Sequence, residues 1–313
     1  MPRKISTLEA QLDRLAELRG QPPTPKGRAE VARCLTSKLN LVVAKAARLA
    51  AEWEAAELAP ELAAAFERFL VKPETTDKRC EAKIEIVKAL CELEYASPAV
   101  FRRGLRHVQM EPSWGKSVDT AGEVRAWSAM GLARVDDPDA LEDILPLLLD
   151  AERDARIGAV RAIAASGLPG DVLLLRLKTL SGDEPEVMGE LFAALLRAAP
   201  EKSVDFVAKY LDHHEEAVAE MAALALGDSR IETAFDVLRK AATRTSHCSL
   251  RRTILLAIAL LRRENAIDYL LEVVQHGDDQ ASADAADALA TYAEDPHLRE
   301  RLDNAKTNRR GAQ

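Results

Sequence analysis

Aromatic side chains are scarce in this chain of 313 residues, where Phe, Trp and Tyr together make up 4%. Hydrophobic residues as a whole reach 48%, and Ala and Leu are the commonest among them. Both are strong helix formers, because they lose little rotamer freedom in a helix. Small Ala side chains also let helices approach closely. The composition therefore predicts an all-α protein made of thin helix layers and disfavours a single aromatic core.

Cysteine is also infrequent. The four cysteines, Cys34, Cys80, Cys91 and Cys248, have no C-x-x-C spacing and each lies in a segment predicted to be helical. This pattern indicates buried free thiols rather than a disulfide framework or a zinc site. The N-terminal segment has no apolar core of the signal-peptide kind, and the longest apolar run, residues 254–261, is too short for a bilayer. We therefore expect a cytoplasmic protein without a membrane partner.

Catalytic motifs are missing as well. The sequence contains no Gly-rich phosphate loop, no G-x-S-x-G and no H-E-x-x-H motif. Its six histidines are scattered. The adjacent His213 and His214 would point about 100° apart on a helix, which disfavours a shared metal ion. Neighbouring glutamates arise by chance in a chain with 51 acidic residues. We predict no catalytic residue, no metal site, no cofactor and no enzymatic activity.

The distribution of charge bears on the partner. The net charge is −8, yet residues 1–28 and residues 296–313 each carry more Lys and Arg than Asp and Glu. The body between these ends is therefore strongly acidic. An acidic body does not attract phosphate backbones, since nucleic-acid binding depends on basic side chains that displace counterions. A nucleic-acid partner is disfavoured.

An internal repeat is the strongest positive signal. Six segments place small or apolar residues at i, i+3 or i+4, and i+7, and their starts at residues 124, 157, 187, 218, 250 and 282 are 30 to 33 residues apart. Each segment follows a capping signal and precedes a break and a second apolar helix. Helix pairs of this length cannot bury their apolar faces alone, so the repeat predicts an α-solenoid of stacked antiparallel helix pairs.

A family resemblance accompanies the repeat. The segment EVRAWSAMGLARVDDPDALEDILPLLLD, residues 123–150, follows the form V-R-x-x-A-x-x-A-L, with the small residues Ser128 and Gly131 at the two Ala positions, and resembles HEAT repeats. The short period is most similar to the HEAT-like repeats of phycobilisome lyases and bacterial adaptor proteins. Residues 106–121 also resemble a stretch of uncharacterised bacterial HEAT-repeat proteins. The resemblance covers about residues 30–300 and implies a right-handed solenoid, but it implies no particular activity.

The same signals divide the chain into segments that we expect to form one continuous solenoid domain. Upstream of the regular repeats the intervals lengthen to about 40 residues, and the stretch QPPTPKG is typical of a linker. The expected segments are an N-terminal helix with a Pro-rich linker (1–28), irregular helical repeats (29–108), a non-helical loop (109–119), regular repeats (120–300) and a flexible basic tail (301–313).

The HEAT resemblance implies that the V-R-x-x-A helices line a concave groove. From repeat to repeat the charges along this groove would be basic, basic, acidic, acidic, basic and acidic, which suits a protein surface better than the phosphates of a duplex. In the alternative interpretation these charges solvate an exposed face or connect neighbouring repeats. The predicted partner contacts in the groove are Arg125, Arg156, Arg161, Glu186, Glu190, Glu220, Arg251 and Arg252.

Residues 109–118, QMEPSWGKSV, interrupt the helical pattern, because a helix does not continue across Pro112 and Gly115. Loops of this length inside compact repeats are usually functional or disordered. In one interpretation Trp114 folds back as a hook against Trp127. In the other, the loop presents Trp114 to a partner, as Trp is enriched in binding hot spots. Further contacts would then come from Met110, Lys116 and His107.

The sequence as a whole predicts a cytosolic scaffold or adaptor that binds a protein or peptide through the groove, with the 109–118 loop as a second contact. One alternative is a nucleic-acid-binding protein of the HEAT-like alkylpurine-glycosylase kind, in which Trp53, Trp114 or Trp127 would contact a base. Another is a subunit or enzyme of the phycobilin-lyase kind, which would require a chromophore pocket. Both alternatives rest on the analogy between repeats.

Overall fold

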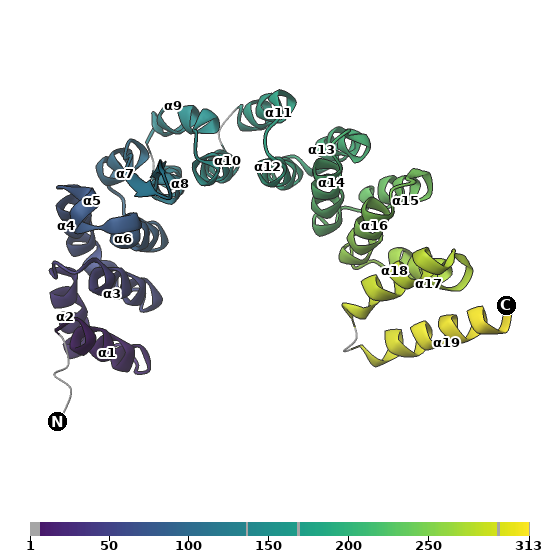
Figure 1. The fold of residues 1–313 in the computed structure, drawn as a ribbon, viewed down its shortest axis with the longest axis horizontal. Helices are drawn as coiled ribbons and strands as arrows, with labels where there is room; N and C mark the ends of the chain where they lie inside the picture. Colours follow the sequence, from purple (N-terminus) through teal and green to yellow (C-terminus); the bar gives the residue numbers. More distant parts are fainter. Residues whose placement is uncertain (1–6, 136, 168–169, 293–294, 313) are drawn as a thin grey trace. The chain divides into compact units, whose positions relative to one another are not determined.

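The computed structural model describes residues 7–135, 137–167, 170–292 and 295–312 (Figure 1). The chain divides into two compact units, Met1–Leu168 and Pro169–Gln313. The sequence predicted one continuous solenoid domain, and this stays a prediction. Gly167 closes the last helix of unit 1 with φ +60°, and Gly170 precedes the first helix of unit 2 with φ +98°. Glycine adopts this left-handed region without steric cost.

In the described residues of unit 1, the regular elements are helices except for one pair of short strands. Its helices, in chain order, are α1 (Thr7–Arg19), α2 (Pro25–Leu35), α3 (Asn40–Glu52), α4 (Ala59–Phe69), α5 (Pro73–Thr76), α6 (Glu81–Glu92), α7 (Pro98–Leu105), α8 (Gly122–Leu132), α9 (Ala140–Ile144) and α10 (Arg153–Ser166). The strands β1 (Met110–Ser113) and β2 (Lys116–Asp119) lie between α7 and α8, and 3₁₀ turns occupy Ala56–Leu58, Lys78–Cys80 and Leu145–Leu149.

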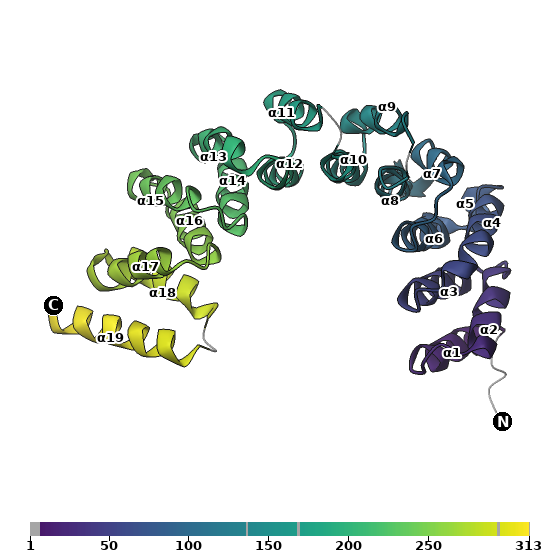
Figure 2. The ribbon, with the colours of Figure 1, turned by 180° about the vertical axis from the view of Figure 1, so that it is seen from behind.

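The helices of unit 1 form two layers, seen from opposite sides in Figures 1 and 2. In the first layer α1, α3, α6, α8 and α10 contact one another in this order, and α2, α4, α7 and α9 follow one another in the second. The layers enclose a core that includes Phe66, Phe69 and Phe101. Helices α8 and α10 approach so closely that a Cβ atom on Gly158 would lie 2.3 Å from the Cα atom of Ala126.

Unit 2 repeats this arrangement with α11 (Asp171–Ser181), α12 (Pro185–Ala198), α13 (Pro200–Ala208), a 3₁₀ turn (Lys209–Asp212), α14 (Glu216–Asp228), α15 (Ala234–Arg244), α16 (Cys248–Leu260), α17 (Glu264–His276), α18 (Asp279–Ala290) and α19 (Pro296–Ala312). Helices α12, α14, α16 and α18 contact one another in series, and each of α11, α13, α15 and α17 packs beside its partner in the repeat. The predicted all-α solenoid of helix pairs is confirmed.

The C-terminal segment differs from the prediction of a flexible tail, because residues 301–312 belong to α19, which packs against α17. Arg301 pairs with two carboxylates of α17, with Glu264 at 2.5 Å and also with Asp268. Arg309 pairs with Asp279 at 2.6 Å and donates to the carbonyl of Gly277. Two of the basic residues that suggested a solvated tail, Arg301 and Arg309, therefore pair with acidic residues of the neighbouring helices.

The cysteines follow the prediction only in part. All four are free; Cys34, Cys80 and Cys91 are buried, whereas Cys248 is exposed at the start of α16. Cys80 lies in a 3₁₀ turn with φ +56° rather than inside a helix. Burial raises the pKa of the Cys80 thiol to about 11. None of the helices in the described ranges combines the length and hydropathy that a bilayer-spanning segment requires.

Candidate functional site

The segment between α7 and α8, predicted as a non-helical loop, forms a β-hairpin. Its strands are antiparallel, with Met110 opposite Asp119 and Ser113 opposite Lys116. Trp114 and Gly115 make the two-residue turn, and their φ angles are +36° and +85°. Type I′ hairpin turns require positive φ at both central positions. Gly115 adopts this conformation freely, whereas for Trp114 it is strained.

Trp114 lies at the tip of this hairpin with its side chain 105% exposed. The interpretation of Trp114 as a hook against Trp127 is therefore wrong, because the tight turn directs the tip away from the helices. A Cβ atom on the adjacent Gly115 would meet nothing within 4 Å. Trp127 is half-buried on α8, where the Lys88 ammonium lies 5.2 Å from its ring centroid.

Three more large apolar side chains on or beside the hairpin are exposed. Met110 is 47% exposed, Val118 43% and Val108 58%. Single exposed apolar residues are common on protein surfaces, but several on one short segment indicate an interaction site. Lys116, a predicted contact residue, is exposed next to the turn. We call Val108, Met110, Trp114 and Val118 the hairpin surface.

A buried arginine fixes the end of β2. Arg125 on α8 is 3% exposed, so its predicted place as a groove contact is wrong. It pairs with Asp119 at 2.8 Å and makes two hydrogen bonds of 2.8 Å to Asp150. Burial disfavours the charge of Asp119, but hydrogen bonds from the amides of Gln109 and Ala121 and from Arg125 outweigh it and lower the pKa of Asp119.

A second polar anchor holds the start of β1. Gln109 is buried, and its side-chain amide donates to the carbonyl oxygen of Asp77 at 2.8 Å. Asp77 in turn forms a fully buried pair with Lys83, with 2.9 Å between the ammonium and the carboxylate. The carboxylate of Glu111 accepts from the backbone N–H of Arg79 at 2.7 Å. Together with the Arg125–Asp119 pair, these bonds attach both strands to the body of unit 1 and fix the hairpin base.

His107, predicted as a partner contact, lies at this base rather than at the tip. It is half-buried, its Nε2 atom is 3.3 Å from the side-chain oxygen of Gln109, and its carbonyl accepts from Arg125. Burial and, next, the charge of Lys83 lower the pKa of His107. The ring is therefore neutral at neutral pH and helps to position the hairpin.

An acidic cleft of about 370 Å³ lies beside β2. Sequence reasoning missed it, because its carboxylates come from different helices. Glu85 pairs with Arg48 at 2.7 Å, and Asp119 pairs with Arg125. The other four carboxylates form no ion pair within the described ranges. The residues that line the cleft are Arg79, Glu81, Ile84, Glu85, Val118, Asp119, Thr120, Gly122, Glu123, Glu152 and Asp154.

A second cleft, of about 390 Å³, lies on the α7 side of the hairpin and is basic. His107, Val108, Leu70 and Pro73 line it together with three arginines, each of which has an acidic partner. Arg102 pairs with Asp137 at 2.8 Å and with Asp143 at 2.5 Å, Arg106 also reaches Asp143, and Arg103 pairs with Glu67. The positive charge of this cleft is therefore compensated.

The remaining predicted groove contacts in unit 1 lie on α10. Arg156 is 8% exposed and donates to the carbonyl oxygens of Asp150 and Ala151 at 2.9 and 3.0 Å. Its prediction as an exposed partner contact is wrong, because these bonds draw the guanidinium back onto the turn before its own helix. Arg161 is exposed, as a groove contact requires.

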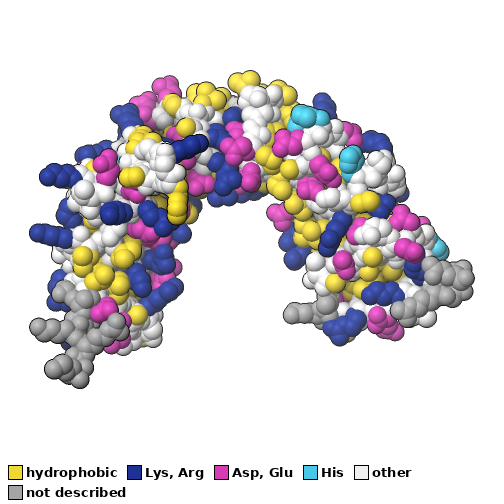
Figure 3. Space-filling model, viewed as in Figure 1, with side chains coloured by type: hydrophobic (Ala, Val, Ile, Leu, Met, Phe, Trp, Pro, Cys, Tyr) yellow, Lys and Arg dark blue, Asp and Glu magenta, His cyan; other side chains and the backbone are white. Residues whose placement is uncertain are grey.

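In unit 2 three of the predicted groove contacts, Glu220, Arg251 and Arg252, connect neighbouring helices. Glu220 accepts from the hydroxyl of Ser249 on α16 at 2.6 Å. Arg251 pairs with Asp278, the N-cap residue of α18, at 3.2 Å. Arg252 pairs with Asp287 on α18 at 3.8 Å. On α12, Glu186 is exposed and Glu190 is half-buried, pairing with Arg197. A partner in the groove stays a prediction. On the face drawn in Figure 3, Lys and Arg of the described residues lie among Asp and Glu rather than in one stripe.

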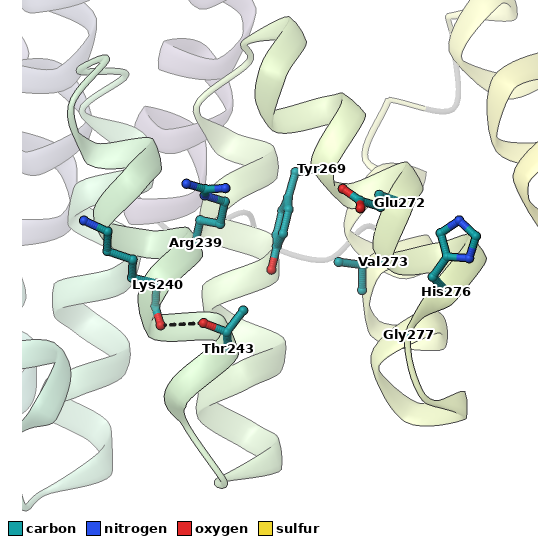
Figure 4. A pocket seen from close by; sticks show the side chains of 8 residues that line it. All are labelled: Arg239, Lys240, Thr243, Tyr269, Glu272, Val273, His276 and Gly277. Atoms are coloured by element: carbon teal, nitrogen blue, oxygen red, sulfur yellow. Dashed lines mark hydrogen bonds between the residues drawn. The ribbon is translucent and has the colours of Figure 1, made fainter.

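A further pocket, of about 450 Å³, lies between α15 and α17 in unit 2 (Figure 4). Burial raises the pKa of Tyr269, whose ring meets Phe235 edge-on at 6.1 Å. Arg239 pairs with Asp236 at 3.3 Å. The residues that line the pocket are Arg239, Lys240, Thr243, Tyr269, Glu272, Val273, His276 and Gly277. Across the described part of the chain, no group of three or more His, Cys, Asp or Glu side chains is placed to hold a metal ion.

Comparison with known proteins yields no matching family model and no matching curated protein. Among solved structures, human deoxyhypusine hydroxylase in complex with glycerol is similar at 17% identity, over 83% of this chain and 92% of that chain, with a TM-score of 0.33. The CpcE–CpcF complex of phycocyanin lyase from Nostoc sp. is similar at 12% identity, over 75% and 91%, with a TM-score of 0.39. An engineered protein is similar at 18% identity, over 97% and 90%, with a TM-score of 0.35.

These similarities describe a HEAT-like helical-repeat fold and nothing finer. They also correct one prediction. The sequence motifs suggested that the chain has no enzymatic activity, but two of the similar folds belong to a hydroxylase and a lyase. The absence of familiar catalytic motifs in a helical-repeat chain is therefore no ground for excluding catalysis.

Proposed function

We propose that this chain is a scaffold or adaptor protein that binds a protein partner through the hairpin surface of unit 1. The observation that carries the proposal is the full exposure of Trp114 at the tip of a hairpin whose base is fixed by buried polar contacts. The proposal moves the main contact from the groove to the hairpin, and Lys116 stays part of it.

The energetics of binding support this assignment. Trp buries a large area and is enriched among the residues that dominate binding energy. A fixed hairpin base means that little conformational entropy is lost when the partner binds. The unfavourable φ of Trp114 adds a second argument, because strained residues concentrate at functional sites. A residue that served only the turn would be Asn or Gly.

The surroundings of the hairpin favour a protein over a nucleic acid. An exposed Trp can stack on a base, as single-strand-binding proteins do. However, the cleft beside β2 is lined by carboxylates, including Glu123, Glu152 and Asp154, which repel phosphates. A cytoplasmic location is part of the proposal and is supported by the four free thiols, which suit a reducing compartment.

Photo-cross-linking in the native host tests the proposal. A benzoylphenylalanine residue replaces Trp114 in one variant and the exposed Glu61 of α4 in a control variant. We expect a discrete protein adduct from position 114 that position 61 does not give. A nuclease-sensitive adduct would replace the proposal with the nucleic-acid alternative. The proposal fails if position 114 gives no adduct beyond those of position 61.

A further inference from the structure

Resting on the proposed function, we infer the chemistry of the partner: an extended peptide segment with alternating Lys or Arg side chains, which pairs with β2 and extends its cations into the acidic cleft. Three features carry this inference. They are the free edge of β2, the apolar side chains beside that edge, and the uncompensated charge of the cleft.

The edge of β2 has the backbone groups that an extended segment needs. The backbone N–H of Thr120 donates to the carbonyl of Gln109. Along an antiparallel strand, residues whose N–H and C=O groups bond to the partner strand alternate with residues whose groups face away from it. This alternation leaves the N–H and C=O groups of Ser117 facing outward on β2. The equivalent outward position on β1 is Pro112, which has no N–H to donate. An added strand therefore pairs with β2 rather than with β1.

The position of β2 brings such a segment over the acidic cleft. Val118 and Asp119 of β2, with Thr120 directly after it, line this cleft. Alternate side chains of a paired strand point to the same face, so every second residue of the segment would reach the cleft. Val118 is exposed on the cleft side and provides apolar contact for the stems of the side chains that enter the cleft.

The charge of the cleft selects the sign of those side chains. Four lining carboxylates have no ion-pair partner among the described residues, and Arg79 is the one basic residue in the lining. Three of them lie in the first turns of α6, α8 and α10, where the helix dipole favours a negative charge. The four carboxylates are those of Glu81, Glu123, Glu152 and Asp154, and Glu152 is the N-cap residue of α10.

The basic cleft beside α7 provides the comparison. Its three arginines are each paired with an aspartate or a glutamate, so an acidic partner would have to compete with bonds already made. A basic partner meets no such competition at Glu123 or Asp154. Charge complementarity across an interface sets the choice of partner more than it sets affinity.

Fluorescence polarisation with a labelled peptide in which Lys and Val alternate tests the inference, and a matched Glu-Val peptide serves as the reference probe. The full chain is compared with a cleft variant carrying Glu123→Gln, Glu152→Gln and Asp154→Asn. A matched control variant carries Glu54→Gln, Glu61→Gln and Glu92→Gln, three exposed carboxylates of unit 1 without ion pairs among the described residues. Helical circular dichroism verifies that both variants are folded.

We expect the full chain to bind the Lys-Val peptide and not the Glu-Val peptide. The cleft variant should bind it about ten-fold more weakly, because three exposed charge pairs are lost, and the control variant should stay within about two-fold of the full chain. Equal weakening of both variants, or no binding of the Lys-Val peptide by the full chain, overturns the inference. An adduct at position 114 together with either result leaves the proposed function standing, so the two failures are distinguishable.

Discussion

Arg125 on α8 and Asp119 at the end of β2 form a buried ion pair, with 2.8 Å between the guanidinium Nη1 and the carboxylate Oδ2. This contact joins the hairpin to the helical body. Arg125 also holds Asp150 through two hydrogen bonds, so one guanidinium bonds two carboxylates. A buried charge that loses its partner is costly, whereas a complete buried pair contributes little net stability. The arrangement therefore positions the hairpin more than it stabilises the fold.

Replacing Arg125 by Ala should destabilise unit 1 by about 3 kcal/mol, because Asp119 and Asp150 would both be left without their cation. All three tryptophans, Trp53, Trp114 and Trp127, belong to unit 1, so urea unfolding followed by Trp fluorescence reports on this unit. The control is Arg103→Ala, which removes an exposed pair and should cost less than about 1 kcal/mol. Equal losses in the two variants would contradict this account.

Acid should weaken the attachment of the hairpin. The pKa of Asp119 is lower in the folded chain than its ordinary value of 3.8, so its ionised form stabilises the fold. This contribution is fully present above the ordinary value and is lost as the pH falls through the lowered pKa. In Asp119→Asn, the difference in urea midpoint between neutral and acid pH should be smaller than in the unmodified chain. Glu61→Gln, an exposed control, should leave the difference unchanged.

The thiols should differ in reactivity. Cys248 is exposed, whereas Cys34, Cys80 and Cys91 are buried, and burial raises the pKa of each buried thiol. Since the thiolate is the reactive form, an aromatic disulfide reagent should modify one thiol rapidly in the native chain. Absorbance of the released thiol provides the count, and Cys248→Ser should abolish the fast phase. A fast phase that persists in this variant would mean that a buried thiol is accessible.

Local signals in the sequence were sufficient for the helices of the regular repeats. The repeat of small and apolar residues at helical spacing predicted the segment at 124–133, which is α8 and its C-cap, because each such helix buries one face against its neighbours. The same local signals did not predict the C-terminal helix α19. Only Leu298 and Ala305 of α19 are buried among its described side chains, and its arginines contact α17 and the start of α18, which no local pattern reveals.

The site was less predictable than the fold for a similar reason. Pro112 and Gly115 excluded a helix, and Trp-Gly between two short extended runs is compatible with a two-residue hairpin turn. The exposure of Trp114 was one of two open interpretations. The burial of Arg125 could not be predicted, because its partner Asp150 lies 25 residues away along the chain. The acidic cleft likewise depends on how three helices pack.

The strain at Trp114 provides a test that separates a structural role from a binding role. Asn adopts positive φ more readily than Trp, and Asn-Gly is the preferred pair for a type I′ turn. Trp114→Asn should therefore stabilise unit 1 by up to about 1 kcal/mol in urea unfolding, with Trp53 and Trp127 as the remaining probes. The same variant should lose the partner that position 114 cross-links. If the ring of Trp114 only held the hairpin in place, the variant would give the opposite pattern. Its stability in urea would fall, because the packing of the ring is lost, and the partner would still bind.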